Sequence, residues 1–423
     1  MGHTPSMMQA PKSYAIRIDN HSDSKALIHY LINQRPIEGL NGLEHKRGLL
    51  FSRSEIDRYM EEEQLHDVKV LTKGRPQTLN TMSSGEQKKA LLAHLLGQKP
   101  DFLILVNPFD NLDVETQSHL REELKNIGST RILVQLVGRV EDILPETTDF
   151  YFLKGDQLLQ YHTAEAFWET TGMSQTFEGN IPFPIHREEM TWDELVNFNG
   201  VSVSFDGRQV LDQVHWTVKP GEFWQLIGPN GSGKTTLLSM ITGDSHKGYG
   251  QDLTLFGQKK GSGESVWDLK EKIGYFTPAV TDRFKGYHSL ENMVISGLHD
   301  SIGLYVIPSD TERQLAHSWL GLLGLHDKRE QYFRDLSTGE KRLVMIARAM
   351  VKHPPLLILD EPTAGLDDPS ARLLVTLVNK MAQESNTAIL FVSHRKEPGL
   401  RAELHYILDL GDNESQGRAL KNR

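Results

Sequence analysis

The chain has 423 residues, of which 38% are hydrophobic and 24% charged, and its formal net charge is −10. This balance predicts a globular protein of two or three domains and excludes a general attraction for nucleic acid or anionic lipid. Because the sequence contains no cysteine, disulfides and thiolate metal sites are excluded as well.

The location of the protein is predicted from two missing patterns. No apolar stretch approaches the roughly 18 residues that a membrane-spanning helix needs. The first residues also lack the basic start and apolar core of a secretory signal. We therefore expect a cytoplasmic protein without a membrane segment of its own, which could lie at the inner face of the plasma membrane only through a separate permease subunit.

In chain order, the first half contains Met82-Ser-Ser-Gly-Glu-Gln87 and an apolar run that ends at Val106. Compositional changes then divide the chain. We expect a first domain over residues 1–165, a Pro-bearing surface linker over 166–195, and a second domain over 196–411 with an inserted helical part around 286–350. Residues 412–423 are polar, and we expect a frayed tail there.

The second half contains a phosphate-binding loop, Gly228-Pro-Asn-Gly-Ser-Gly-Lys-Thr235. Residues 222–227 before it predict a strand, and residues 235–241 predict a helix whose N-terminus favours anions. Glycines let successive N–H groups turn toward phosphate oxygens, while the lysine reaches the β- and γ-phosphates and the threonine can bind Mg²⁺. The expected nucleotide-binding residues are Gly228, Asn230, Gly231, Ser232, Gly233, Lys234, Thr235 and Thr236.

A pair of carboxylates follows the apolar run Leu356-Leu-Ile-Leu359. A buried strand that delivers two carboxylates at its end suits a magnesium site with an adjacent base. We expect Asp360 to hold Mg²⁺, directly or through water. We expect Glu361 to polarise the water that attacks the γ-phosphate.

Together with Leu336-Ser-Thr-Gly-Glu-Lys341, Ala364-Gly-Leu-Asp367 and Phe391-Val-Ser-His394, these motifs resemble the ATP-binding cassette (ABC) family. The resemblance implies an α/β fold, with a mixed sheet core and a helical subdomain. It implies that His394 contacts the γ-phosphate and that Phe205 stacks on adenine. The glutamine that the family usually has after Ile273-Gly-Tyr275 is missing, which puts coupling to a transmembrane partner in doubt.

An internal repeat shows that the first half resembles a cassette too. With an offset of 254, Met82–Gln87 matches 336–341, and the match continues without a gap to Leu112-Asp113. At this register Val106 and Asn107 replace both carboxylates. The fold class is therefore two tandem cassettes, the first degenerate and shortened by about 45 residues between loop and signature.

The remaining motifs of the first half are degraded as well. Setting Lys25 on Lys234 replaces the three loop glycines by polar side chains and the magnesium-binding threonine by Ala26. Residues 133–139 contain no histidine where the second half has His394. The first half nevertheless keeps Ser83 and Gly85, the signature residues that the family lends to the opposite cassette.

The family pairs two cassettes head to tail, so this pattern predicts one hydrolytic site within a monomer, with ATP as substrate and Mg²⁺ as cofactor. It would join the phosphate loop of the second half to Ser83 and Gly85. The chain resembles the stand-alone tandem cassettes named for molybdate transport, the ModF type. Two alternatives stay open: the energising subunit of an importer with a separate permease, and a translation or DNA-repair protein. The net charge argues against nucleic acid as a partner.

Overall fold

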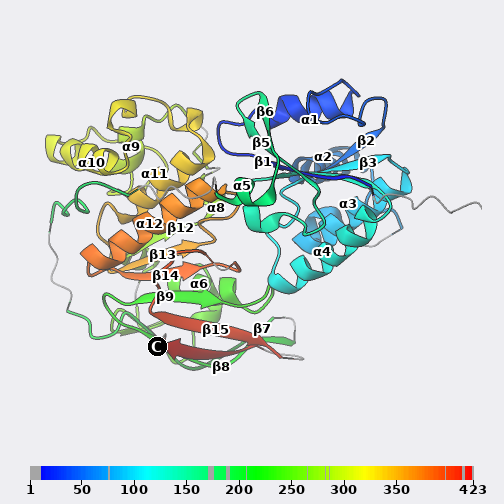
Figure 1. Cartoon of the computed structure of the whole chain (residues 1–423). Helices are drawn as coiled ribbons and strands as arrows, with labels where there is room; N and C mark the ends of the chain where they lie inside the picture. Colours follow the sequence, from blue (N-terminus) through cyan, green and yellow to red (C-terminus); the bar gives the residue numbers. More distant parts are fainter. Residues whose placement is uncertain are drawn as a thin grey trace, which may run out of the picture. The chain divides into compact units, whose positions relative to one another are not determined.

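The computed structural model describes residues 11–421 except 75–76, 170–175, 187–190, 206, 264, 282, 285, 396 and 412–414. The chain forms two compact units, Met1–Met173 with Gly365–Pro369, and Ser174–Ala364 with Ser370–Arg423. Each unit has a sheet and helices of its own (Figure 1). Within the described residues, no helix combines the length and apolar character needed to span a membrane.

The first unit is a six-stranded sheet with helices on both faces (Figure 1). Its central strands are short apolar runs whose alternating side chains enter two separate cores, as expected for a sheet covered on both sides. The strands are β1 (Ser13–Arg17), β2 (Gly48–Phe51), β3 (Phe102–Val106), β4 (Ile132–Val137), β5 (Asp149–Lys154) and β6 (Gln157–Tyr161), and the α-helices are α1 (Ser24–Ile32), α2 (Arg53–His66), α3 (Ser84–Gly97), α4 (Val114–Gly128) and α5 (Ala164–Glu169).

The second unit contains a ten-stranded mixed sheet. Its strands are β7 (Val196–Phe205), β8 (Arg208–Val218), β9 (Phe223–Ile227), β10 (Leu253–Leu255), β11 (Gln258–Lys259), β12 (Ile273–Phe276), β13 (Leu356–Asp360), β14 (Ala388–Val392), β15 (Leu404–Leu410) and β16 (Ser415–Lys421). Its α-helices are α6 (Lys234–Thr242), α7 (Val266–Lys272), α8 (Pro278–Thr281), α9 (Leu290–Ile295), α10 (Asp310–Leu322), α11 (Thr338–Met350) and α12 (Asp368–Glu384). Helices α9, α10 and α11 gather at one side of this unit, where the inserted helical part was predicted (Figure 1).

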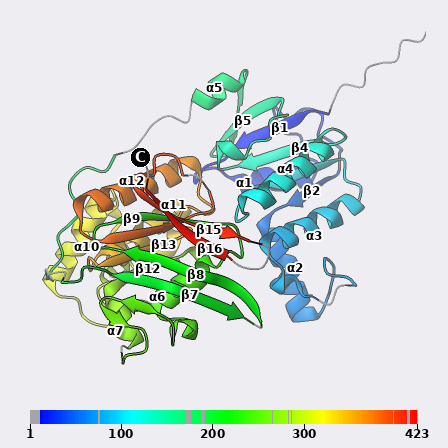
Figure 2. The same ribbon diagram turned by 90° about the horizontal axis from the view of Figure 1, so that it is seen from below.

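The two units share one strand order, which confirms the internal repeat at the level of topology. The first sheet runs β2-β3-β4-β1-β5-β6, and six strands of the second run β12-β13-β14-β9-β15-β16. In both, the inner strands are parallel and the last pair is antiparallel. The second sheet adds the strands β7, β8, β10 and β11, which have no counterpart in the first sheet. Figure 2 shows β7 and β8 side by side.

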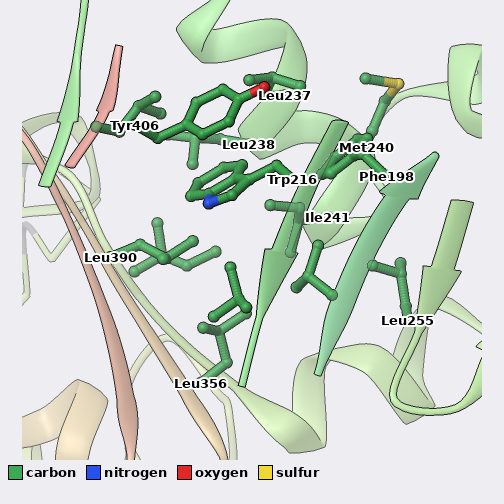
Figure 3. Close-up of a cluster of buried hydrophobic side chains, with 14 of the residues drawn as sticks. Phe198, Trp216, Leu237, Leu238, Met240, Ile241, Leu255, Leu356, Leu390 and Tyr406 are labelled. Atoms are coloured by element: carbon green, nitrogen blue, oxygen red, sulfur yellow. The ribbon is translucent and has the colours of Figure 1, made fainter. Parts of the chain in front are cut away.

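The core of the second unit lies between α6 and these added strands, and aromatic rings fill its centre (Figure 3). The Trp216 ring stacks on Tyr406 with 4.5 Å between centroids, and the Phe198 ring lies nearly parallel to Trp216 with 6.3 Å between centroids. Burying such rings stabilises a fold by several kcal/mol each, on the order of 3–5 kcal/mol for an aromatic truncated to Ala. Packing from α6 into this core fixes the position of the loop that precedes the helix.

Two predictions about the ends of the second domain are wrong. Residues 412–423 were expected to fray, yet β16 (Ser415–Lys421) pairs along its length with β15. The segment 166–195 was expected to be a surface linker, yet the Ile181 side chain is only 4% exposed and its N–H donates to Glu384. Residues 170–175 and 187–190 of that segment lie outside the described part of the chain.

Candidate functional site

The predicted phosphate loop joins β9 to α6, as the strand and helix patterns indicated. Gly231 and Gly233 adopt φ values of 81° and 90°, a region that L side chains disfavour. A Cβ atom at Gly233 would also lie 2.5 Å from Leu211 Cδ2. Glycine at this position is therefore required both by backbone conformation and by space.

The loop is built to receive an anionic ligand. Lys234 Nζ donates to the carbonyl oxygens of Gly228 and Pro229 at 2.6 and 2.9 Å, so the ammonium group curls over the loop. Ser232 Oγ is buried and has no hydrogen-bond partner among the described residues. The N-terminus of α6 faces the same loop, and helix N-termini favour phosphate groups.

Two carboxylates follow the buried strand β13, as predicted. Burial, together with the neighbouring charge of Glu361, raises the pKa of Asp360 to about 6. The charge of Lys234 and the nearby Tyr275 hydroxyl oppose that rise. A buried carboxyl group whose charge is so poorly compensated suits a divalent cation as partner.

The donor set fits Mg²⁺ bound together with a nucleotide rather than alone. Among the described residues, no cluster of three or more His, Asp or Glu side chains could hold a metal ion. Mg²⁺ usually takes one or two protein ligands and completes its shell with phosphate oxygens and water. Thr235 and Asp360 would supply such protein ligands.

Glu361 and His394 form a pair beside this carboxylate. His394 Nδ1 lies 2.9 Å from Glu361 Oε1, and the His394 Nε2 atom is buried without a partner in the described structure. Glu361 has φ 50° and its N–H donates to Val392 O at 2.9 Å. A non-glycine residue in this region costs of order 1 kcal/mol or more and is typical of functional sites.

The remaining predicted residues of this unit lie at the ends of their elements. Phe205 ends β7 and is 40% exposed, with Lys247 Nζ 5.0 Å from its ring centroid. Thr236 continues α6, and Asn230 lies in the phosphate loop. The sheet edge thus brings together Lys234, Asp360, Glu361 and His394, because the parallel strands β9, β13 and β14 end there.

Both signature segments begin a helix in the same way. Ser83 and Ser337 are N-caps of α3 and α11, and each forms a reciprocal capping box with the glutamate three residues later. A Cβ atom at Gly85 would lie 2.7 Å from Thr116 Cγ2. Ser83 and Gly85 belong to the first unit, as the repeat predicted.

Comparison with known proteins identifies the family to which the chain belongs. A model of the ABC transporter family matches residues 211–364. Over 330 residues the chain is 41% identical to the ABC transporter ATP-binding protein ModF of Escherichia coli, covering 75% of this chain and 67% of that protein. The chain belongs to the family of ABC transporter ATP-binding proteins. It is therefore an ABC-type ATPase with a ModF-like tandem organisation.

A second ABC relative shows the same extent of similarity. The uncharacterised ABC transporter ATP-binding protein C323.04 of Schizosaccharomyces pombe is 30% identical over 330 residues, covering 76% of this chain and 66% of that protein. The chain thus spans about two thirds of the length of these two relatives. In fold, it is similar to one chain of a solved structure of ribosome-bound archaeal Pelota and ABCE1, with a TM-score of 0.64, 16% identity, and coverage of 97% and 74% of the two chains.

Strand pairing aligns the two ABC units residue by residue. Val106 on β3 lies opposite Leu136 on β4, and Asp360 on β13 lies opposite Val392 on β14. Leu136 is therefore the equivalent of Val392. Two residues beyond Val392 the second unit has its histidine, and two residues beyond Leu136 the first unit has Gly138.

The same pairing corrects the predicted alignment of the first loop. Through β4 and β14, Ile16 is the equivalent of Leu226. Ser24 lies as many residues after Ile16 as Lys234 lies after Leu226. Ser24 begins α1, and Lys234 begins α6. The prediction that Lys25 aligns with Lys234 is wrong by one residue, because the sheet register fixes what a degraded loop sequence does not. The first ABC unit has no lysine at this position.

The first loop closes on itself through its own side chains. Asp23 caps α1 by accepting the Ala26 N–H, where a phosphate would bind in a working loop. The His21 N–H donates to Asp19 Oδ1, and the Asp19 N–H donates to Ser22 Oγ. Loop N–H groups that a phosphate cradle would need are thus engaged within the unit.

The position after β3 is closed in a similar way. Asn107 replaces Glu361 and keeps the left-handed backbone, with φ 43°. Its Oδ1 atom accepts the Gly138 N–H at 2.9 Å. A neutral amide with its oxygen already engaged cannot serve as a base, so this unit lacks the pair formed by Glu361 and His394.

Tyr275 is a residue of this site that the motif search did not single out. It lies on β12, the strand that pairs with β13, and burial together with the charge of Asp360 raises the pKa of its hydroxyl. The sequence signal for it is its place in the run Ile273-Gly-Tyr275, directly before the segment that lacks the family's glutamine.

Proposed function

We propose that this chain hydrolyses Mg·ATP at one composite site, made of the second unit's phosphate loop and the first unit's Ser83 and Gly85. The observation that carries the proposal is the asymmetry of the repeat. The first unit keeps a fully capped signature helix, which it would lend, while its own loop is filled by Asp19 and Asp23. A copy that had simply decayed would be expected to lose both sets of residues.

The residues of the second unit have distinct roles in this proposal. Lys234 and the loop N–H groups bind the β- and γ-phosphates, and Phe205 stacks on adenine. Thr235 and Asp360 hold Mg²⁺, which would neutralise charge that develops on the phosphates. Glu361 accepts a proton from the attacking water, and His394, 2.9 Å from its Oε1 atom, orients the carboxylate and faces the γ-phosphate.

In this proposal the two units of one monomer pair with each other, and the protein works without a dedicated permease. The tandem organisation shared with ModF supports this reading. The segment after β12 supports it too, since Phe276-Thr-Pro-Ala-Val280 contains no glutamine to report hydrolysis to a transmembrane partner. A permease that co-purifies from native membranes in an ATP-dependent manner would contradict it.

The composite site is tested by a matched pair of variants, Ser83→Ala and Ser337→Ala. Each removes an equivalent helix cap, which costs about 1 kcal/mol of stability. Only Ser83 would reach the hydrolysed ATP, so Ser83→Ala should lower kcat about tenfold or more. Ser337→Ala should leave kcat within about twofold. Equal losses in the two variants would overturn the composite site.

A second test uses Gly85, whose added Cβ atom would meet Thr116 Cγ2. The substitution Gly85→Asp is therefore made in the background Thr116→Ser, which removes that methyl group. Compared with Thr116→Ser alone, the double variant should lose ATPase activity and keep nucleotide binding to the second unit. Full turnover in the double variant would exclude Gly85 from the site.

A further inference from the structure

A buried hydrogen bond joins the two segments that carry Glu361 and His394. The Thr363 hydroxyl donates to Glu397 Oε1 at 2.5 Å. Thr363 follows Glu361 by two residues, and Glu397 follows His394 by three. We propose that Thr363 and Glu397 are a positioning pair, which keeps the Glu361 carboxylate within hydrogen-bond distance of the His394 ring. This inference rests on the roles proposed for Glu361 and His394.

The positioning pair forms one of three links between these segments. The first link is on the side of the sheet, where β13 and β14 are paired in parallel and the Glu361 N–H donates to Val392 O at 2.9 Å. The second link is the contact between Glu361 and His394. The third, further along both segments, is the bond from Thr363 to Glu397. The catalytic contact therefore has a hydrogen bond on either side of it.

Each segment turns directly after its strand, and each turn has hydrogen bonds of its own. Glu361 has φ 50°, and its carbonyl oxygen accepts the Ala364 N–H at 3.1 Å. On the other segment, the Arg395 N–H donates to Ser393 Oγ at 3.1 Å. These bonds shape one turn or the other without joining them. The hydrogen bond of the positioning pair joins the two turns.

Both members of the positioning pair are buried. The exposed fractions of Thr363 and Glu397 are 3% and 5%. A carboxyl group removed from water costs free energy unless it is hydrogen-bonded, and apolar side chains of similar size could fill the same space without that cost. A hydrogen bond has a preferred length and angle, so it defines the distance between the two segments more narrowly than apolar packing would.

The internal repeat has an apolar residue in the place of this donor. With the offset of 254, Phe109 is the equivalent of Thr363. Phe109 is fully buried and belongs to an apolar cluster of the first unit. Packing alone can therefore hold the segment after the strand. The hydroxyl donor is present in the unit that has Glu361 and His394, and it is absent from the unit that lacks them.

The test separates turnover from nucleotide binding. Thr363→Val keeps the shape of the side chain and removes the hydroxyl. It should lower kcat about tenfold, because small displacements of catalytic groups cost up to about 100-fold in rate. Affinity for a fluorescent ATP analogue should stay at the wild-type value, since Lys234 and the phosphate loop are unchanged. Thr363→Ser keeps the donor and should have nearly wild-type turnover. Wild-type kcat in Thr363→Val, or an equal loss in Thr363→Ser, would overturn the inference.

The matched control is Thr387→Val, which removes another buried threonine hydroxyl from the second unit. Thr387 is 2% exposed, and its hydroxyl donates to Pro354 O at 2.8 Å. These two residues precede β14 and β13, so they lie at the opposite strand ends from the site. The kcat of Thr387→Val should stay at the wild-type value, and chemical unfolding measures the stability that each variant loses. An equal loss of kcat in the control would show a general effect of weakening the sheet and would overturn the positioning role.

A double variant tests whether the two residues act as a pair. Glu397→Leu removes the acceptor and should lower kcat as Thr363→Val does. Because both substitutions break one hydrogen bond, the double variant should be no slower than the slower of the two single variants. Losses that multiply in the double variant would show that the residues act separately and would overturn the pairing.

Glu361→Gln separates this inference from the proposed function. If Glu361→Gln has wild-type turnover, the role of Glu361 fails and the inference fails with it. If Glu361→Gln loses turnover and Thr363→Val does not, only the positioning pair fails.

Discussion

His394 Nδ1 lies 2.9 Å from Glu361 Oε1 in the second unit. The equivalent pair in the first unit is Gly138 and Asn107, joined by an N–H to amide oxygen bond of the same length. The backbone after the strand is left-handed in both units. The backbone after this strand is therefore present twice, and only the second unit has side chains there that can move a proton.

Replacing Glu361 by Gln should lower kcat by roughly 10²–10⁴-fold, because the amide cannot accept a proton from water. Nucleotide affinity should remain close to the wild-type value, since Lys234 and the loop are unchanged. Steady-state phosphate release and equilibrium nucleotide titration measure the two effects. Asn107→Asp, which keeps the acceptor for Gly138, is the control and should leave turnover unaltered. A Glu361→Gln variant with normal turnover would require another base.

The phosphate loop of the second unit and the corresponding loop of the first unit should respond differently to substitution. A change in the former should affect ATP affinity, and a change in the latter should affect only stability. Gly233→Ala places a Cβ atom 2.5 Å from Leu211 Cδ2 at a φ of 90°, so ATP affinity should fall about tenfold or more. Asp23→Ala removes the cap of α1 and should cost about 1 kcal/mol of stability, with no change in ATP affinity. Nucleotide titration and chemical unfolding distinguish these outcomes. Loss of ATP affinity in Asp23→Ala would show that the first loop takes part in binding.

Much of this site was predictable because its parts are local segments. The phosphate loop, the strand before Asp360 and both signature caps carry their chemistry within a few consecutive residues. The gapless repeat from residue 82 to 113 also predicted that the two units would share topology, since equal spacing between a helix and a strand implies equal geometry.

Other features depend on contacts between distant segments, and the sequence alone could not define them. The first loop was aligned one residue out, because only the pairing of β1 with β4 fixes its register. The sequence of β16 was predicted to be a polar tail. It forms a strand because it pairs with β15, and this sheet environment is not visible in its own sequence. Tyr275 lies beside the strand of Asp360 only because β12 pairs with β13, and more than 80 residues separate the two side chains in the chain.

The segment before β7 should contribute to the stability of the second unit. Ile181 is 4% exposed, its N–H donates to Glu384, and the neighbouring Pro182 O bonds to His353 Nε2 at 2.7 Å. Ile181→Ala should therefore lower the free energy of unfolding by about 2–5 kcal/mol. Phe183→Ala, at a side chain that is 73% exposed, is the control and should change it by less than about 0.5 kcal/mol. Equal effects of the two substitutions on the free energy of unfolding would indicate that this segment does not pack against the second unit.

Glu340 should give the second unit a measurable dependence on pH. Its carboxylate lies 2.5 Å from Lys328 Nζ and accepts the Ser337 N–H at 3.0 Å. Burial raises the pKa of Glu340, but these hydrogen bonds lower it more, so the net pKa lies below the usual value of 4.5. A carboxyl group with a lowered pKa stabilises the fold above the unfolded-state pKa, and this contribution is lost as pH falls through the folded-state pKa.

Glu340→Gln should accordingly lower the free energy of unfolding at pH 7 by a few tenths to about 1 kcal/mol, a small effect because solvent screens this partly exposed pair. The difference from wild type should shrink as pH is lowered from 5 toward 3, since the wild-type carboxylate becomes protonated and loses its ion pair. Urea unfolding of both proteins across this pH range measures the difference in the free energy of unfolding. Lys328→Met removes the same ion pair from the other side and should reproduce the trend. A difference that stayed constant with pH would mean that the cap, rather than the charge of Glu340, provides the stabilisation.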